Sequence, residues 1–257
     1  MFYLTSSNKS PPQLSAGESE SYTETDKPVS QTLDPWVAPD LNTPRGRIFA
    51  AATRLFSEAG YRDTNTRAIA KAAGVKQVML NYYYGTKTQL YEAVLRHEGM
   101  AMLAVIFDGK PDHKSPEDKL IDTPIRLMTV LHENPQWASL LRHEIAAGAI
   151  HLRNALKDVS EYGPLGANQH FHNAYITAVK TGKVVKLPIE AVRECLLAIG
   201  YSAIYLAPLI SMINERDFHD ETVWEEWKLT LSTILKRGLL TNLSVPVDAP
   251  VHSAVVA

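Results

Sequence analysis

The sequence contains one cysteine, Cys195, among its 257 residues. A single cysteine excludes an intramolecular disulfide framework, and it also excludes a zinc site built mainly from cysteines. Residues 1–30 lack the continuous apolar core of a secretory signal peptide. We therefore expect the chain to be cytoplasmic.

The motifs of common enzyme classes are missing as well. The sequence has no nucleophile elbow, no glycine-rich phosphate loop and no metal-binding triad. His170 and His172 are two positions apart and fall on different faces of a helix, and the neighbours His143 and Glu144 diverge in the same way. The sequence therefore predicts a protein that is not an enzyme and holds no cofactor and no metal. An all-α enzyme is the alternative from another functional class.

Paired β-strands are not indicated anywhere, and helical spacing dominates. After residue 110, prolines predict helix starts and glycines predict helix ends. The candidate helices in this part cover 117–133, 135–147, 168–181, 189–213 and 221–239. Residues 148–167 have no clear period, because Gly163, Pro164 and Gly166 interrupt it. The sequence therefore predicts an all-α fold.

Charge is distributed unevenly along the chain. Residues 1–42 carry two lysines against six acidic residues, a net charge of −4, and residues 43–95 carry eight Lys and Arg against three acidic residues, a net charge of +5. The remainder has 16 basic and 19 acidic residues, which brings the total to −2. A basic segment in an acidic chain favours a polyanionic partner, although a solvated basic helix face gives the same count.

Both ends of the chain look unlike the rest. Residues 1–42 are rich in Ser, Thr, Pro and Glu without apolar periodicity, which predicts a disordered N-terminal tail. Residues 241–257 contain prolines and many small residues, which predicts a flexible C-terminal tail.

Residues 195–213 contain no charged residue and are long enough to span a bilayer. Gly200, Pro208 and the lack of a basic flank argue against a membrane anchor. We expect instead a helix buried in the core or in a dimer interface, and no membrane partner. A membrane-associated protein is the alternative.

Residues 44–87 carry the pattern that points to function. Thr43 and Pro44 predict the start of a first helix and Gly60 its end. Residues 66–87, TRAIAKAAGVKQVMLNYYYGTK, predict two short helices joined by a turn at Gly74. Their apolar side chains predict a small core: Leu55, Phe56, Ile69, Ala70, Ala73, Val75 and Leu80. This is the helix-turn-helix pattern, in which the second short helix enters the major groove of DNA. A helical hairpin without a nucleic-acid partner is the alternative.

Three segments in this region resemble a known family. They are FSEAGY at 56–61, TRAIAKAAGV at 66–75 and LNYYYGTKTQL at 80–90. Together, residues 44–95 resemble the N-terminal domain of the tetracycline-repressor (TetR) family of bacterial one-component regulators. Met79, Asn81 and Tyr84 depart from the residues that are common in that family, so the resemblance does not give the DNA sequence that is bound.

The resemblance implies a set of DNA contacts. Phosphate contacts are expected from Thr66, Tyr83 and Lys87, with Thr66 also capping the second helix. The residues expected to face bases or the groove are Arg67, Lys76, Gln77, Val78, Asn81 and Tyr82. Gln and Asn suit the edge of adenine, and Arg suits guanine. The implied partner is a double-stranded DNA operator.

The resemblance also implies that residues 43–95 form the helix-turn-helix domain and that residues 96–240 form a helical domain for ligand binding and dimerisation. The candidate ligand-binding residues have polar or large side chains on otherwise apolar helices. They are Met100, Leu103, Phe107, Arg126, His132, Trp137, Arg142, Glu144, Tyr175, Tyr201 and Tyr205. They favour an apolar or aromatic ligand with one or two polar groups. Arg126 or Arg142 suggests an anionic group, unless Glu144 neutralises either arginine. Pro208 predicts a bend that shapes a cavity.

A stripe on the last helix predicts the dimer contact, with packing inside the same chain as the alternative: Trp224, Trp227, Leu231, Ile234 and Leu235. The helix from Thr86 to about Phe107 is expected to be the lever that carries a ligand signal to the DNA-binding helices. The sequence thus predicts a homodimeric regulator, a repressor, that binds a palindromic operator and is released by a small molecule. A ligand-independent DNA-binding protein of the same fold is the alternative.

Overall fold

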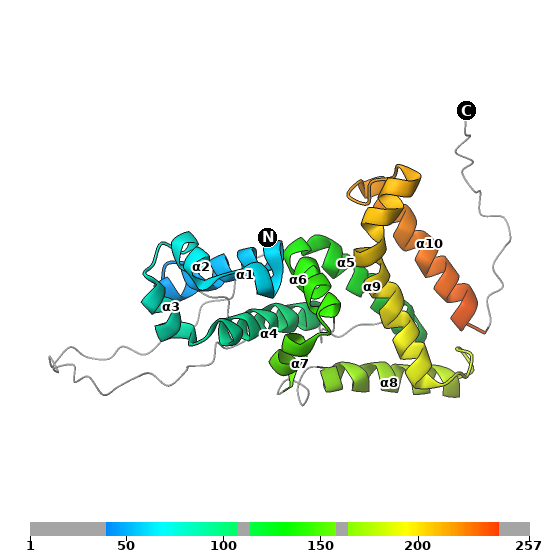
Figure 1. The fold of residues 1–257 in the computed structure, drawn as a ribbon. Coiled ribbons are helices and arrows are strands. Elements are labelled where there is room, and N and C mark those ends of the chain that lie inside the picture. Colours follow the sequence, from blue (N-terminus) through cyan, green and yellow to red (C-terminus); the bar gives the residue numbers. More distant parts are fainter. Residues whose placement is uncertain (1–39, 107–113, 158–163, 242–257) are drawn as a thin grey trace, which may run out of the picture. The chain divides into compact units, whose positions relative to one another are not determined.

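The computed structural model describes residues 40–106, 114–157 and 164–241. Over these ranges the regular secondary structure is helical, apart from one isolated β-bridge between Val184 and Leu240. The helices are α1 (Pro44–Asp63), α2 (Thr66–Ala72), α3 (Gln77–Tyr84), α4 (Lys87–Ile106), α5 (Pro116–Glu133), α6 (Pro135–Ala146), α7 (Ile150–Leu156), α8 (Pro164–Lys180), α9 (Ile189–Asn214) and α10 (Glu221–Leu239) (Figure 1). The predicted all-α class is confirmed.

Helix α1 starts as the sequence predicts and ends in a more complex way. The side chain of Thr43 accepts a hydrogen bond from the amide of Gly46 at 3.0 Å, and Pro44 occupies the first turn. Gly60 leaves the helical conformation with φ 73° and ψ 178°, and a short continuation runs to Asp63. This backbone region is open essentially to glycine alone, so Gly60 breaks the helix.

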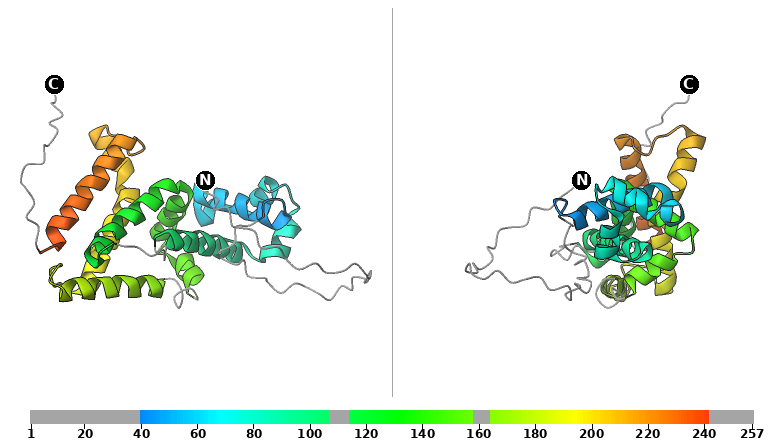
Figure 2. Two further views of the ribbon diagram at one scale, coloured as in Figure 1. Left: turned by 180° about the vertical axis from the view of Figure 1, so that it is seen from behind. Right: turned by 60° about the vertical axis from the view of Figure 1, so that its left-hand side comes forward.

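The N-terminal helices share one apolar core with the middle of the chain. Ile48, Phe56, Ile69 and Leu80 are fully buried in it, as the helix-turn-helix pattern predicts. The same cluster continues through α4 to Trp137 and other residues of α5, α6 and α7. Seen from behind, α4 runs from the blue and cyan N-terminal helices to the green helices α5–α7 (Figure 2).

The later helices are organised around α5, which packs against α8, α9 and α10. One apolar cluster joins α5, α8, α9 and α10 around Ile121, Phe171 and Leu196. A smaller cluster joins Met128 of α5 to Phe218 and Trp224 at the connection between α9 and α10. All three residues of this smaller cluster also line a cavity beside α5.

The predicted helix boundaries agree closely with the observed ones wherever proline marks a start. Pro116 and Pro135 occupy the first turns of α5 and α6. Helix α7 was not predicted, because Gly148 and the left-handed Ala149 directly precede it and its few residues show no period. Helix α8 starts at Pro164, four residues before the predicted start at 168.

Helix α9 is bent. Its halves, Ile189–Ser202 and Tyr205–Asn214, meet at 54°. Pro208 lies inside the helix and lacks the amide hydrogen that would bond to the carbonyl four residues earlier, which accounts for the bend. Among the residues that the structure describes, no single helix is long and apolar enough to cross a membrane, and the bent pair meets the criteria of length and composition only when taken together.

Part of the predicted organisation lies outside the described residues, namely most of both tails and Phe107. Residues 40–42, placed in the tail by composition, form a turn in which the amide of Thr43 bonds to the carbonyl of Asp40 at 3.0 Å. The predicted boundary between residues 95 and 96 falls inside α4. The division into domains stays a prediction.

The conformation of Gly60 leads to a test of stability. A Cβ atom at this position lies 3.0 Å from Nδ1 of His143 and forces an alanine into a strained backbone. We expect Gly60→Ala to lower the free energy of unfolding by about 1–3 kcal/mol, measured by urea denaturation. Gly238→Ala is the control, because a Cβ there has no neighbour within 4 Å and the residue is helical, so a gain of about 0.5–1 kcal/mol is expected. Equal stability of Gly60→Ala and wild type would contradict this role of Gly60.

Candidate nucleic-acid interface and effector cavity

The turn between α2 and α3 is held by backbone hydrogen bonds. Gly74 adopts φ 65°, and the amides of Gly74 and Val75 bond to the carbonyls of Lys71 and Ala70 at 3.2 and 3.0 Å. The left-handed glycine reverses the chain at the end of α2. Ala70 and Ala73 are buried, and their small side chains let the two helices approach closely.

Helix α3 presents one face to solvent. Val78 and Tyr82 are 65% and 58% exposed, although both are largely apolar. Lys76, Gln77 and Asn81 are exposed on the same short segment, while Leu80 is fully buried on the opposite side. A helix that exposes polar and aromatic side chains in this way has the form of a recognition helix.

Side-chain hydrogen bonds hold α3 against its neighbours. The hydroxyl of Tyr84 donates to the carbonyl of Arg45 in α1 at 2.9 Å, and burial, opposed by the charge of Arg45, raises the pKa of Tyr84 to about 12. The amide of Gln77 donates to the hydroxyl of Thr66 at 3.0 Å, which joins the first residues of α3 and α2. The orientation of α3 is therefore tied to that of α1.

The predicted capping role of Thr66 is wrong. Asn65 is the N-cap of α2: its backbone is extended, and its side chain accepts a hydrogen bond from the amide of Ala68 at 2.9 Å. Thr66 is the first helical residue and uses its hydroxyl to accept the bond from Gln77 instead. Asparagine and threonine are both good caps, so the sequence alone does not distinguish these adjacent positions.

The start of α4 lies beside the recognition helix. The Thr86 hydroxyl accepts from the amide of Gln89 at 3.2 Å, and the Gln89 side chain accepts from the amide of Thr86 at 2.8 Å, which forms a reciprocal capping box. Lys87 places its ammonium 4.4 Å from the ring centre of Tyr61 and donates to the carbonyl of Arg62 at 3.4 Å. Lys87 is thereby positioned at the first turn of a helix, where anions are stabilised.

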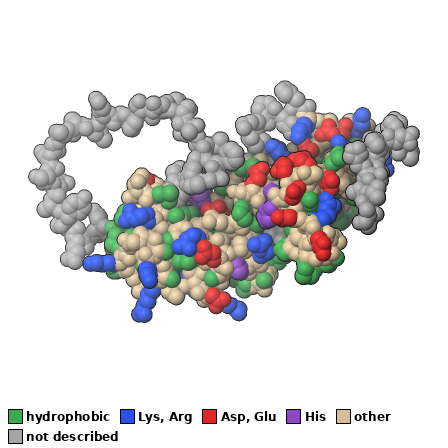
Figure 3. Space-filling model, turned by 90° about the horizontal axis from the view of Figure 1, so that it is seen from above, with side chains coloured by type: hydrophobic (Ala, Val, Ile, Leu, Met, Phe, Trp, Pro, Cys, Tyr) green, Lys and Arg blue, Asp and Glu red, His purple; other side chains and the backbone are tan. Residues whose placement is uncertain are grey.

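Positive charge predominates on the surface at this end of the molecule. Figure 3 shows Lys and Arg side chains over the N-terminal helices on the left and many Asp and Glu side chains over the later helices on the right. Arg67 and Lys76 are exposed, and neither forms an ion pair within the described residues. The predicted DNA-facing residues are thus brought together on one basic surface, with Tyr83 partly buried beside Tyr82 at a ring distance of 5.1 Å.

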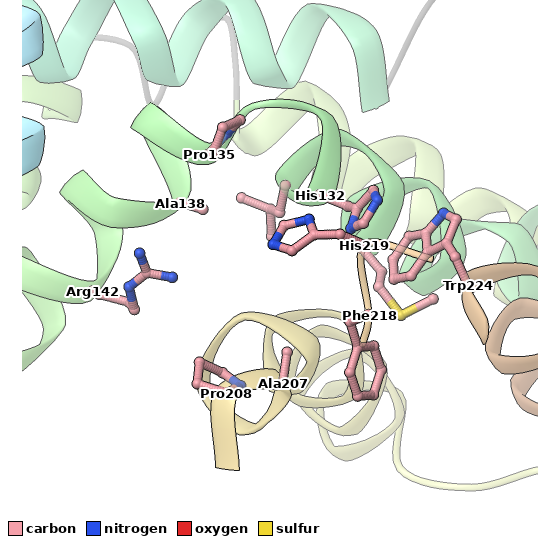
Figure 4. Close-up of a pocket in the computed structure, with 11 residues that line it drawn as sticks. His132, Pro135, Ala138, Arg142, Ala207, Pro208, Phe218, His219 and Trp224 are labelled. Atoms are coloured by element: carbon pink, nitrogen blue, oxygen red, sulfur yellow. The ribbon is translucent and has the colours of Figure 1, made fainter. Parts of the chain in front are cut away.

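A cavity of about 280 Å³ lies between α5, α6, α9 and the connection to α10 (Figure 4). Its lining consists of Met128, Leu131, His132, Pro135, Ala138, Arg142, Ala207, Pro208, Phe218, His219 and Trp224. Only His132 and Arg142 among the predicted ligand-binding residues line it. Pro208 lies at the bend that the sequence predicts to shape a cavity, but the loop residues Phe218 and His219 show no periodic signal.

Several other predicted ligand residues serve the core. The indole nitrogen of Trp137 donates to the sulfur of Met102 at 2.7 Å, and Met100 is 2% exposed. Glu144 is 1% exposed and accepts a hydrogen bond from the amide of Leu152 at 2.9 Å. Burial and the charge of Glu144 raise the pKa of Tyr91. Glu144 therefore lies toward α4 and α7, and it forms no ion pair with either predicted arginine within the described ranges.

The predicted tyrosines have three different environments. Tyr175 is 3% exposed, and its hydroxyl donates to the carbonyl of Leu187 and accepts from the amide of Leu187, both at 2.7 Å, which anchors the connection between α8 and α9. Tyr201 is partly buried against the larger core, whereas Tyr205 is 37% exposed. Burial raises the pKa of both Tyr201 and Tyr205. Leu103 and Arg126 are half-buried and do not line the cavity.

A direct link joins α6 to α1. The hydroxyl of Ser139 donates to the carbonyl of Ser57 at 2.7 Å, and Nε2 of His143 lies 3.2 Å from the same oxygen. Both α6 residues come from the helix that also places Ala138 and Arg142 at the cavity. The sequence did not reveal this link, because a backbone carbonyl carries no residue-type signal.

The fold, the exposed face of α3 and the basic residues on the segments around it define a helix-turn-helix DNA-binding protein. Residues 48–94 match the family described as bacterial regulatory proteins, tetR family. The chain is 28% identical over 194 residues to the HTH-type transcriptional regulator RutR of Escherichia coli strain K12, a match that covers 75% of this chain and 88% of RutR. The chain is thus similar to transcriptional regulators of the TetR family, and its residues 48–94 match the model of that family.

Solved structures share the fold at low sequence identity. The ketosteroid transcriptional regulator KstR2 of Mycobacterium tuberculosis matches with a TM-score of 0.59 at 15% identity, over 80% of this chain and 100% of KstR2. The fatty acid degradation regulator FadR from Bacillus halodurans matches with a TM-score of 0.56 at 17% identity, over 74% of this chain and 93% of FadR. These likenesses support the arrangement of an N-terminal helix-turn-helix followed by a helical domain.

The position of Lys87 leads to a test of DNA binding. We expect Lys87→Ala to weaken binding to every DNA sequence and to lower the slope of log affinity against log salt by about one unit, because one phosphate contact is lost. The measurement is fluorescence anisotropy over a range of salt concentrations. Lys119→Ala is the control, since Lys119 is an exposed lysine on α5. An unchanged slope in Lys87→Ala would show that Lys87 does not contact the DNA backbone.

Proposed function

We propose that this protein is a ligand-responsive transcriptional repressor that binds a palindromic DNA operator as a homodimer and is released by a small molecule. The observation that carries the proposal is the exposed face of α3, where Gln77, Val78, Asn81 and Tyr82 point away from the core of a basic domain. We assign base reading to these residues and to Arg67.

Phosphate contacts are assigned to the surrounding residues. Thr66, Tyr83 and Lys87 border α3, and Lys76 directly precedes it. Phosphate contacts fix the register of the protein on DNA and do not select sequence. Such a regulator acts on the chromosome, so we place the protein in the cytoplasm of a bacterial cell. The proposed function requires no enzymatic activity.

Homodimer formation is supported by exposed apolar side chains on α9 and α10. Leu209, Met212 and Ile213 are 48%, 71% and 65% exposed on α9, and Leu229 and Ile234 are 70% and 61% exposed on α10. Large exposed apolar patches mark interaction sites. The residues of the predicted stripe on α10 differ in burial: Trp224 and Leu235 pack within the chain, whereas Ile234 is exposed.

Ligand response is supported by the cavity beside α6. A ligand-independent DNA-binding protein has no need of a cavity in its later helices, and the helix that borders this cavity also bonds to α1. A ligand that binds one arrangement of α6 better than another shifts the orientation of the recognition helices.

Selection of random DNA by the purified protein tests the proposed function. We expect an inverted repeat whose half-sites lie about 34–36 Å apart, one turn of the double helix. Gln77→Ala and Asn81→Ala should each relax one base position per half-site, at a cost of about 1–3 kcal/mol. Gln136→Ala, an exposed glutamine on α6, is the control. Selection of no common sequence, or of the same sequence by all variants, would overturn the assignment of α3 as the reader.

The assembly has its own test. We expect the wild type to be a dimer at micromolar concentration by light scattering, with an apolar interface of about 2,000 Å² or more. Met212→Glu should shift the protein towards monomer, because a charge in an apolar interface is costly. Ile150→Glu is the control, since Ile150 is 60% exposed on α7, away from α9 and α10. A monomeric wild type would rule out the homodimer and the palindrome together.

A further inference from the structure

We infer that the cavity between α5, α6 and the α9–α10 connection is a binding site for a small aromatic carboxylate. The inference rests on the proposed function, because it names the chemistry of the effector that the regulator would sense. It is carried by the contrast between flat apolar walls and a single permanent cation in the same cavity (Figure 4).

One wall of the cavity is built from stacked planar rings. The imidazole of His132 lies parallel to the indole of Trp224, with ring centres 4.0 Å apart and an interplanar angle of 11°. Phe218, Pro208 and Met128 add further flat or apolar surface to the lining. Aromatic rings attract other rings in offset or edge-to-face contact, so this lining favours a planar aromatic ligand over a branched aliphatic one.

The charged group is Arg142. Figure 4 shows its guanidinium directed into the cavity from α6. Arg142 forms no ion pair within the described residues, no acidic residue is among those that line the cavity, and Glu144 bonds to the amide of Leu152 instead. A guanidinium matches the two oxygens of a carboxylate with paired hydrogen bonds, so the partner that the cavity lacks is a planar anion.

The histidines supply further polar points without adding a permanent charge. The rings of His132 and His219 lie 5.6 Å apart at the cavity, and neither has a hydrogen-bond partner for its ring nitrogens in the described part of the chain. Burial, together with His219, lowers the pKa of His132, although Glu133 and Glu221 act in the opposite direction. Neutral imidazoles donate one hydrogen bond and accept another, which suits a hydroxyl substituent on the aromatic ring.

The volume limits the size of the ligand. A cavity of about 280 Å³ lies just below the usual range of about 300–1,000 Å³ for ligand pockets. One or two fused rings with a carboxylate therefore fit better than a steroid or a long acyl chain. The cavity offers one cation among apolar walls, and one cation cannot neutralise the several negative charges of a nucleoside triphosphate. Such a polyanion is therefore excluded as the ligand.

The test is calorimetric titration of the full-length, DNA-free protein with benzoate and 1-naphthoate. Two matched probes separate the parts of the inference: 1-naphthamide keeps the rings and removes the charge, and cyclohexanecarboxylate keeps the charge and removes the aromatic ring. We expect 1-naphthoate to bind at least tenfold more tightly than either matched probe, because it alone meets both the ring wall and Arg142.

Variants locate the site. Arg142→Gln should weaken the binding of 1-naphthoate by about tenfold or more and leave the binding of 1-naphthamide unchanged. Ala207→Phe should abolish the binding of both by filling the cavity. Arg153→Gln, an exposed arginine on α7, should bind as the wild type does. Thermal unfolding of each variant establishes that it is folded. Equal binding of acid and amide, or an unaltered affinity in Arg142→Gln, would overturn the inference.

A separate titration on operator DNA distinguishes this inference from the proposed function. Binding of 1-naphthoate at the cavity without DNA release supports the site and contradicts the effector role. Failure of every aromatic acid to bind a protein that still selects an operator overturns the site and leaves the proposed function standing.

Discussion

The hydrogen bonds at the carbonyl of Ser57 are the constraint on which the rest of the arrangement depends. The helix breaks at Gly60, and a helix end leaves carbonyls of its last turn without amide partners. The single hydroxyl proton of Thr64 is shared between the carbonyls of Leu55 and Gly60, at 3.1 and 2.8 Å, and α6 supplies Ser139 and His143 to the carbonyl of Ser57. Because Ser57 is 6% exposed, water cannot readily replace these donors. The end of α1 is thus held by α6.

This constraint explains how two distant functions could share one fold. Helix α1 is bonded to α3 through Tyr84 and Arg45 and to α6 through Ser57 and Ser139, so α1 connects α6 to the helix assigned to recognition. On α6, the cavity residue Ala138 directly precedes Ser139, and Arg142 directly precedes His143. The sequence predicts α4 as the lever from cavity to DNA. The hydrogen bonds add a second connection through α6, by which a shift of one helix would act on both proposed sites.

Sequence patterns predict the parts of this protein that depend on local physics. Proline at helix starts and the apolar period of residues 44–84 specify the helices and the small core of the helix-turn-helix, and these agree with the structure. The cavity could not be predicted in the same way, because it is assembled from segments far apart in sequence, including the loop residues Phe218 and His219. Tyr175 illustrates the difference: a polar point on an apolar helix was expected to meet a ligand, but the backbone of Leu187 already satisfies it.

Helix α9 is where the proposed effector site and the proposed dimer contact meet. Its bend at Pro208 turns Ala207 and Pro208 to the cavity, while Leu209 and Met212 remain exposed on the same half of the helix. A ligand against Pro208 therefore lies within one helix diameter, about 10–12 Å, of the apolar surface assigned to the partner. Packed helices change between discrete arrangements rather than deforming continuously, so a shift of this half of α9 would alter the relation between the protomers of the proposed dimer as a unit. In the proposed dimer, the cavity is thus connected both to α3 within one chain, through α6, and to the spacing of the two recognition helices, through α9.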